Sequence, residues 1–203
     1  MPPDFWAHVR VHLGLAGAAL AIALVVAVPA GLFSAKRAAA RPLVLGLVNV
    51  GRVVPSLAVL TLLLPVWGVG AKTAIAALAL LAIPPIAINT DVAIRNIPMA
   101  VTDAARGLGM LPRQILWRIE APLAFPIVLA GTRTAAVEVI ASATLATFIG
   151  GGGLGEYITT GLQANDTHLL LVGVTAVALL AIASELAFTA LLQFAGTKQR
   201  SRA

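Results

Sequence analysis

The chain has 203 residues, of which 60% are hydrophobic and only 11% are charged, with a formal net charge of +6. Its mean hydropathy is +0.98. Because an ordinary soluble domain has roughly 45–50% apolar and about 25% charged residues, this composition excludes a soluble globular protein. It also excludes a disordered chain, which needs low hydrophobicity, and a disulfide scaffold, since the chain has 0 cysteines.

Apolar stretches of membrane-spanning length follow one another from the first residues to the last. A transmembrane helix needs about 20 apolar residues, so we expect one all-α membrane domain over residues 1–203 with about five spans. The predicted spans are residues 12–33, 43–67, 72–91, 122–149 and 168–194. A signal peptide is the alternative for the first span, but its apolar stretch exceeds the usual h-region of roughly 7–15 residues and cations follow it.

Basic residues predict the orientation, because Lys and Arg in short connections are retained on the cytoplasmic side. They gather in the first connection, the third connection and the tail: Lys36, Arg37, Arg41, Arg95, Arg106, Arg113, Arg118, Lys198, Arg200 and Arg202. We therefore expect the N-terminus outside and the C-terminus in the cytoplasm. Retention of these cations explains the pI of about 11.1, and no basic stripe with interleaved aromatic residues indicates nucleic-acid binding.

The connection over residues 96–121 is the long polar stretch between predicted spans. Its pattern predicts a short helix over 99–106 and another over 113–120, separated by Gly107 and Gly109, with Pro122 ending the second. Two short helices under the membrane form a knob that could dock on a cytoplasmic partner. An amphipathic hairpin lying on the headgroups fits the same residues, and the pattern leaves both open.

A motif in this connection resembles the "EAA" loop of bacterial ABC importer permeases. Asp103-Ala104-Ala105, Gly109, Ile119 and Pro122 have the spacing of that loop, with Asp103 in place of Glu. Further segments resemble the osmoprotectant branch of these permeases, which serves glycine betaine, carnitine and choline. They cover nearly the whole chain and include residues 54–58, 130–136, 150–155, 161–163 and 165–167.

This resemblance implies a MetI-like permease core in the bacterial inner membrane, with a cytoplasmic coupling helix-turn-helix between the third and fourth spans. It implies the translocation path of an ATP-driven importer for a quaternary-ammonium osmoprotectant such as glycine betaine, carnitine or choline. The chain itself would be no enzyme: ATP and Mg would bind cytoplasmic ABC ATPase subunits. The other expected partners are a second permease, identical or homologous, and an extracytoplasmic solute-binding protein. The residues that the resemblance assigns to ATPase coupling are Asp103, Ala104, Ala105, Gly109, Ile119 and Pro122.

Two other functions stay open from the sequence. Related permeases share the loop, so the solute could be another small molecule such as an amino acid. A multipass assembly scaffold without transport is the alternative from a different class. A membrane enzyme is disfavoured, because no convergent acid, base or metal ligands accompany the apolar spans.

Charged residues inside the predicted spans are costly, at about 2.5–3.5 kcal/mol each, and usually face a bundle interior. Arg52, Arg133 and Glu138 are of this kind, and each either forms a structural salt bridge or lines the translocation path. We expect Arg52 to pair with Glu138. Candidate path residues are Arg133, Glu138 and Ser142.

Other polar and aromatic positions have simpler interpretations. Asp91 and Glu185 lie nearer the cytoplasmic ends, where we expect them to snorkel or to bind loop cations. Tyr157 and the three tryptophans lie near predicted interfaces and are expected in the aromatic belts.

A glycine-rich stretch over residues 150–155 matches G-x-G-x-x-G, the dinucleotide-binding fingerprint. No strand precedes it, so a tight extracytoplasmic turn with positive φ angles is favoured instead. The three histidines lack a metal-binding pattern, and no cofactor is expected on this chain.

Overall fold

A computed structural model describes residues 4–53 and 56–200, and the side chains of residues 4–50 and 56–194; every regular element in this part of the chain is a helix. Four helical segments in it are long and apolar enough to cross a membrane: α1 (Phe5–Lys36), α4 (Ala71–Arg95), the continuous stretch Pro112–Ile149, and α9 (Thr167–Arg200) over Thr167–Phe194. Two shorter apolar helices, α2 (Arg41–Val53) and α3 (Ser56–Trp67), lie between α1 and α4 in the sequence.

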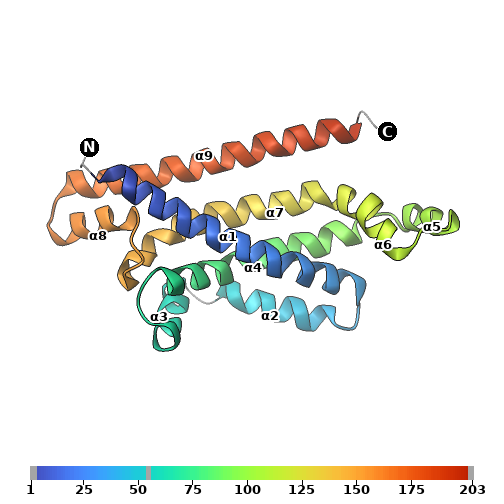
Figure 1. The fold of residues 1–203 in the computed structure, drawn as a ribbon, viewed down its shortest axis with the longest axis horizontal. Helices are drawn as coiled ribbons and strands as arrows, with labels where there is room; N and C mark the ends of the chain where they lie inside the picture. The colour runs from blue at the N-terminus through green and yellow to red at the C-terminus, as the bar shows by residue number, and fades with distance from the viewer. Residues whose placement is uncertain (1–3, 54–55, 201–203) are drawn as a thin grey trace.

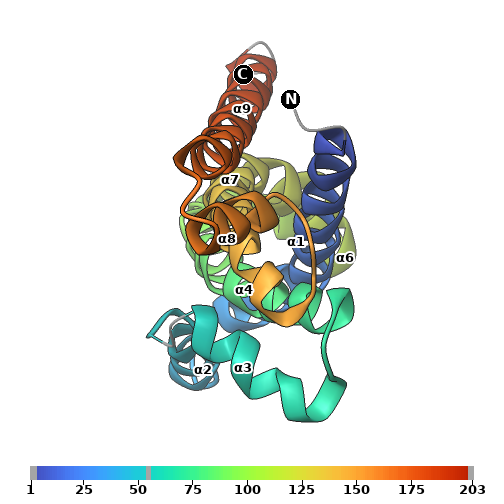
Figure 2. The ribbon, with the colours of Figure 1, turned by 90° about the vertical axis from the view of Figure 1, so that its left-hand side faces the viewer.

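The long helices pack in the order α1, α4, α7 (Ala121–Ser142) and α9, with α2 and α3 against α4 (Figures 1 and 2). The N-terminus and α8 (Gly155–Gln163) lie at one end of the molecule. The C-terminus and the short helices α5 (Met99–Gly107) and α6 (Pro112–Ile115) lie at the other end (Figure 1).

Small residues allow α1 and α4 to approach closely along most of their length. Ala19, Ala23 and Ala27 are fully buried at four-residue intervals on α1, and Gly31 continues the row. A Cβ added to Gly31 would lie 2.5 Å from the backbone oxygen of Ala87 on α4. Close packing of small residues is the usual way for helices to associate in a membrane, where burial from water supplies no driving force between them.

The predicted second span, residues 43–67, consists of two helices rather than one. Figures 1 and 2 show α2 and α3 pointing in clearly different directions. Residues 54–55, including part of one osmoprotectant-like motif, lie outside the described residues. The sequence has proline at position 55, and proline lacks the amide hydrogen that a continuous helix uses there.

The prediction that Pro122 breaks the chain into two helices is wrong. From Pro112 the helix runs without interruption through α6, a π-helical turn η1 (Leu116–Glu120) and α7. The amide of Ala121 donates to the carbonyl of Leu116, five residues earlier. This wider turn directly precedes Pro122, where a regular α-helix would have a missing donor and a ring clash with the previous turn.

The opposite end of α7 changes into a 3-10 helix, η2 (Ala143–Ile149), and then into the glycine turn. Gly150, Gly152 and Gly153 have φ angles of 68°, 76° and 93°, which confirms the expected turn with positive φ. The fully buried His12 of α1 donates from Nε2 to the carbonyl of Ile140 over 2.9 Å. The N-terminal half of α1 is thereby bonded to α7 just before the helical geometry of α7 changes.

Candidate functional site

The segment over residues 96–121 protrudes from one end of the helical bundle as a compact helical hairpin (Figure 1). After α5, the amide of Met110 donates to the carbonyl of Ala105 over 3.1 Å, and Gly109 takes a φ of 78°. The side-chain oxygen of Gln114 accepts from the amide of Leu111 over 2.8 Å and caps α6. These local bonds fix the turn, so the segment is a formed structure and not an irregular loop. We refer to residues 96–121 as the coupling segment, after the role that the sequence resemblance predicts for them.

The two alanines of the motif differ in burial. Ala105 is only 3% exposed and packs inside the hairpin, whereas Ala104 is exposed. Asp103 is also exposed and pairs with Arg106 on the same helix over 2.7 Å. A partner docking on the hairpin would therefore meet Ala104 and not Ala105.

Apolar side chains cover much of the outer surface of the coupling segment. Met99 is 76% exposed, Leu108 is 83% exposed and Leu111 is 64% exposed. Several large exposed apolar side chains within one short segment are typical of a surface that contacts another protein or a membrane. Of the two remaining motif residues, Ile119 is half-buried and Pro122 is exposed at the start of α7.

Two buried carboxylates lie at the base of the coupling segment; sequence reasoning missed the role of Glu120 and the burial of Asp91. Asp91 of α4 is fully buried; it accepts from the Ser34 hydroxyl over 2.8 Å and from Arg41 Nε over 3.1 Å. Glu120, the last residue of η1, is 8% exposed and binds Lys36 Nζ over 2.6 Å.

Asp91 binds cations of the connections, as expected, since Arg95 also lies 3.6 Å from its carboxylate. It does not snorkel, because its side chain is buried. The signal available in the sequence was an acid at the end of an apolar helix that is followed by several cations.

One charged residue within the apolar stretch of α7, Arg133, pairs with α9. Arg133 Nη1 lies 3.2 Å from the Glu185 carboxylate and 3.3 Å from the Thr189 hydroxyl. The Arg133 and Glu185 side chains are 33% and 46% exposed. Glu138 is exposed and Ser142 is half-buried at the end of α7. The side chain of Arg52 lies outside the described residues, so its expected pairing with Glu138 stays a prediction.

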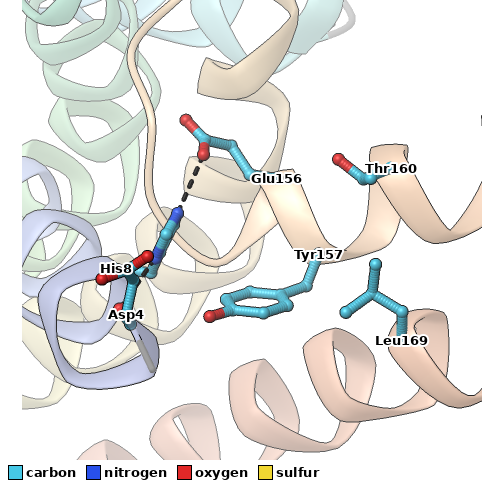
Figure 3. A pocket seen from close by; sticks show the side chains of 6 residues that line it. All are labelled: Asp4, His8, Glu156, Tyr157, Thr160 and Leu169. Carbon is cyan, nitrogen blue, oxygen red and sulfur yellow. Dashed lines mark hydrogen bonds and ion pairs between the residues drawn. The ribbon is translucent and has the colours of Figure 1, made fainter. Parts of the chain in front are cut away.

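At the other end of the molecule, α1, α8 and the start of α9 line a small open pocket of about 230 Å³ (Figure 3). His8 Nε2 lies 2.8 Å from the Glu156 carboxylate, and the Tyr157 ring packs edge-on against the His8 ring. The prediction that Tyr157 anchors an aromatic belt is wrong, because its side chain is only 6% exposed and packs against α1. Burial, with smaller contributions from Asp4 and Glu156, raises the pKa of the Tyr157 hydroxyl. Among the described residues, no group of three or more His, Asp or Glu side chains is placed to hold a metal ion.

Comparisons with known proteins agree with this arrangement. Residues 27–200 match the family described as binding-protein-dependent transport system inner membrane component. The chain is 39% identical over 176 residues to a carnitine transport permease protein of Listeria monocytogenes, covering 87% of this chain and 81% of that protein. It is 37% identical over 171 residues to a choline transport system permease protein of Bacillus subtilis, covering 84% of this chain and 79% of that protein.

Solved structures show the same fold. The inward-facing MetNI methionine ABC transporter contains a chain that superposes with a TM-score of 0.85 at 21% identity, covering 96% of this chain and 99% of that one. The match over residues 27–200 spans most of the sequence, including α4, the coupling segment and α7. The chain therefore belongs to the family of inner membrane components of binding-protein-dependent transport systems.

Proposed function

We propose that this chain forms the translocation path of an ATP-driven importer for a quaternary-ammonium osmoprotectant such as glycine betaine, carnitine or choline. The observation that carries this proposal is the 37–39% identity to permeases for choline and carnitine over 84–87% of the chain. Both solutes carry a trimethylammonium group. Only 5% of the chain is aromatic, and aromatic faces are the usual receptors for such groups. We therefore assign most of the solute selection to a separate solute-binding protein.

We further propose that the coupling segment docks on a cytoplasmic ABC ATPase subunit, which binds ATP and Mg. The exposed apolar side chains of α5 and of the turn that follows it support this role, as does the preformed hairpin that carries them. Asp103, Ala104 and Gly109 would lie at or near the contact, whereas Ala105 would hold the hairpin together from inside. Ile119 and Pro122 would act where the segment joins α7.

The coupling end is proposed to be cytoplasmic, with the C-terminus on the same side and the N-terminus outside. In support, Figure 1 places α5, α6 and the C-terminus at one end of the molecule and the N-terminus and α8 at the other. The cations Lys36, Arg41 and Arg95 contact acids beside the coupling segment, which is the distribution that retention of positive charge on the cytoplasmic side produces.

The translocation path is proposed to run along α7 and to be completed by a second permease, identical or homologous. Arg133 pairs with Glu185 within the apolar span, yet both side chains are substantially exposed in the single chain. A charged pair does not face lipid at this depth without a large cost, so a second subunit or an aqueous path is expected beside it. Glu138 and Ser142, further along α7, are placed on the same path.

The experiment combines copurification with uptake. Wild type, Ala104→Trp and Ala7→Trp are purified from the native host in mild detergent, and retained proteins are identified by mass spectrometry. We expect wild type and the Ala7 control, which is exposed at the other end of the molecule, to retain an ABC ATPase that the Ala104 variant loses. Uptake of radiolabelled choline, carnitine and glycine betaine by cells with and without the chain then tests the solute class.

Two results would contradict the proposal at different levels. Retention of no ATPase by monodisperse wild type would favour the assembly scaffold. Retention of an ATPase without uptake of any of the three solutes would keep the importer and reject the osmoprotectant, with another small solute such as an amino acid as the next test.

A further inference from the structure

One turn at the end of α1 contacts both helices that carry the coupling segment. The hydroxyl of Ser34 donates to Asp91. Asp91 lies four residues before the end of α4, the helix that leads into the coupling segment. Two residues later on α1, Lys36 binds Glu120, which is the last residue before α7 leads away from the segment. The two connections of the coupling segment to the bundle are thus bonded to the same short piece of a third helix.

The carboxylates in these contacts are unusual within the described part of the chain. Asp91 and Glu120 are the two acidic residues there that are buried, and both are bound by this end of α1. Removing a carboxylate from water is costly unless a cation or hydrogen-bond donor stays in contact with it. A motion that separated Lys36 from Glu120 would leave a buried charge without its cation, so the contact resists separation.

Helix α1 packs unequally against the two helices that carry the coupling segment, α4 and α7. It packs extensively against α4 through its row of small residues but contacts α7 much less. The link between α1 and α4 therefore has many contributors, whereas Lys36 and Glu120 form the ion pair that joins the cytoplasmic end of α1 to the helix leaving the coupling segment.

We propose that residues 34–36 of α1 act as a clamp that holds the two ends of the coupling segment together, so that a displacement of the segment moves α1, α4 and α7 as one unit. Lys36 and Glu120 are the positioning residues of this clamp. The inference rests on the proposed docking of an ATPase on the coupling segment. It adds that the Lys36–Glu120 ion pair ties α1 to the helix leaving the segment, so that ATP-driven motion of that helix is passed to α1 as well as to α7.

The test separates coupling from assembly. Glu120→Gln preserves side-chain volume and leaves Lys36, whose side chain is 41% exposed, free to be hydrated. Lys36→Met removes the cation, and the double variant K36E/E120K exchanges the charges. Lys72→Met is the matched control, because Lys72 is exposed at the opposite end of α4 and makes no ion pair with any described residue. Each importer complex is reconstituted in proteoliposomes, and solute uptake and ATP hydrolysis are measured on the same sample.

We expect Glu120→Gln and Lys36→Met to keep ATP hydrolysis stimulated by the binding protein, while solute transported per ATP falls at least about twofold. The charge exchange is expected to recover that ratio in part, and the Lys72 control to match wild type. A merely stabilising role would instead lower the yield of complex and leave the ratio unchanged. If Lys36→Met fails to assemble, Glu120→Gln and the conservative Lys36→Arg, which is expected to keep the wild-type ratio, decide the outcome.

Failure of the clamp and failure of the proposed function give different results. Wild type that neither binds an ATPase nor transports refutes the proposed function. A wild-type complex that transports normally, with Glu120→Gln showing an unchanged ratio or the exchange performing no better than either single variant, overturns the clamp alone.

Discussion

Replacing Asp91 by alanine is expected to cost this protein about 3 kcal/mol of unfolding free energy. The Asp91 carboxylate is fully buried. It accepts a hydrogen bond from the Ser34 hydroxyl at 2.8 Å and pairs with Arg41 at 3.1 Å and with Arg95 at 3.6 Å. Removing one partner of a buried ion pair typically costs roughly 3–5 kcal/mol. The lower end applies here, because the Arg41 and Arg95 side chains are 37% and 45% exposed and water can solvate them after the change.

Two milder variants test separate parts of the same contact, the charge of Asp91 and the hydrogen bond from Ser34. Asp91→Asn keeps the shape and one acceptor for Ser34 but loses the charge, so a cost of about 2 kcal/mol is expected, within the range for hydrogen bonds to charged groups. Ser34→Ala removes one donor from a carboxylate that keeps its arginines, at an expected cost of about 1 kcal/mol. The assay is reversible unfolding in mixed micelles with increasing dodecyl sulfate, followed by tryptophan fluorescence and circular dichroism.

The unfolding free energy is expected to fall most for Asp91→Ala, less for Asp91→Asn and least for Ser34→Ala. If Asp91→Ala were no more destabilising than Ser34→Ala, the carboxylate would not be holding the arginines, and the argument from buried charge would fail. Equal costs for the alanine and asparagine variants would show that the lost charge accounts for the whole cost, because the shape and the acceptor oxygen that asparagine keeps would then contribute nothing.

Three further predictions concern other contacts. Gly155→Ala should destabilise the fold by about 1–3 kcal/mol, because the new Cβ would overlap the backbone oxygen of residue 144, whereas Gly14→Ala, with nothing within 4 Å, should change the melting temperature little. Reversing the charge of Arg133 or Glu185 alone should reduce the yield of folded protein, and exchanging both charges should restore it; a double variant as poor as the singles would argue against the pair. His12→Phe should cost about 1 kcal/mol by leaving a buried carbonyl of α7 without its donor, and unchanged chemical unfolding would contradict the bond at 2.9 Å.

The sequence by itself determined the class of the protein and predicted the place of the segment to which we assign ATPase coupling. Composition and the lengths of apolar stretches require a membrane protein, because these are averages over many residues and do not depend on how the helices pack. The coupling segment is recognisable because its motif is local, with Asp103 and Pro122 only nineteen positions apart in the numbering. The positive φ angles at Gly150, Gly152 and Gly153 follow equally from local chemistry.

Local patterns were insufficient where helix geometry changes within a continuous stretch. Pro122 was expected to end a helix. Instead a π-turn precedes this proline, which has no amide hydrogen to donate, and the helix continues. Residues 43–67 were predicted as one span although they contain Arg52 and Pro55, and their hydropathy did not indicate that α2 and α3 point in different directions. Hydropathy measures whether a segment avoids water, and it is insensitive to the backbone bonds that direct the segment.

The tertiary structure alone decided which side chains act together. Ala104 and Ala105 are chemically identical neighbours, and only the packing of the hairpin turns one outward and buries the other. Lys36 and Glu120 are 84 positions apart, and nothing in either neighbourhood identifies the partner. A buried charge is stabilised by whichever opposite charge the fold brings within reach, so its partner is a property of helix packing and not of sequence spacing.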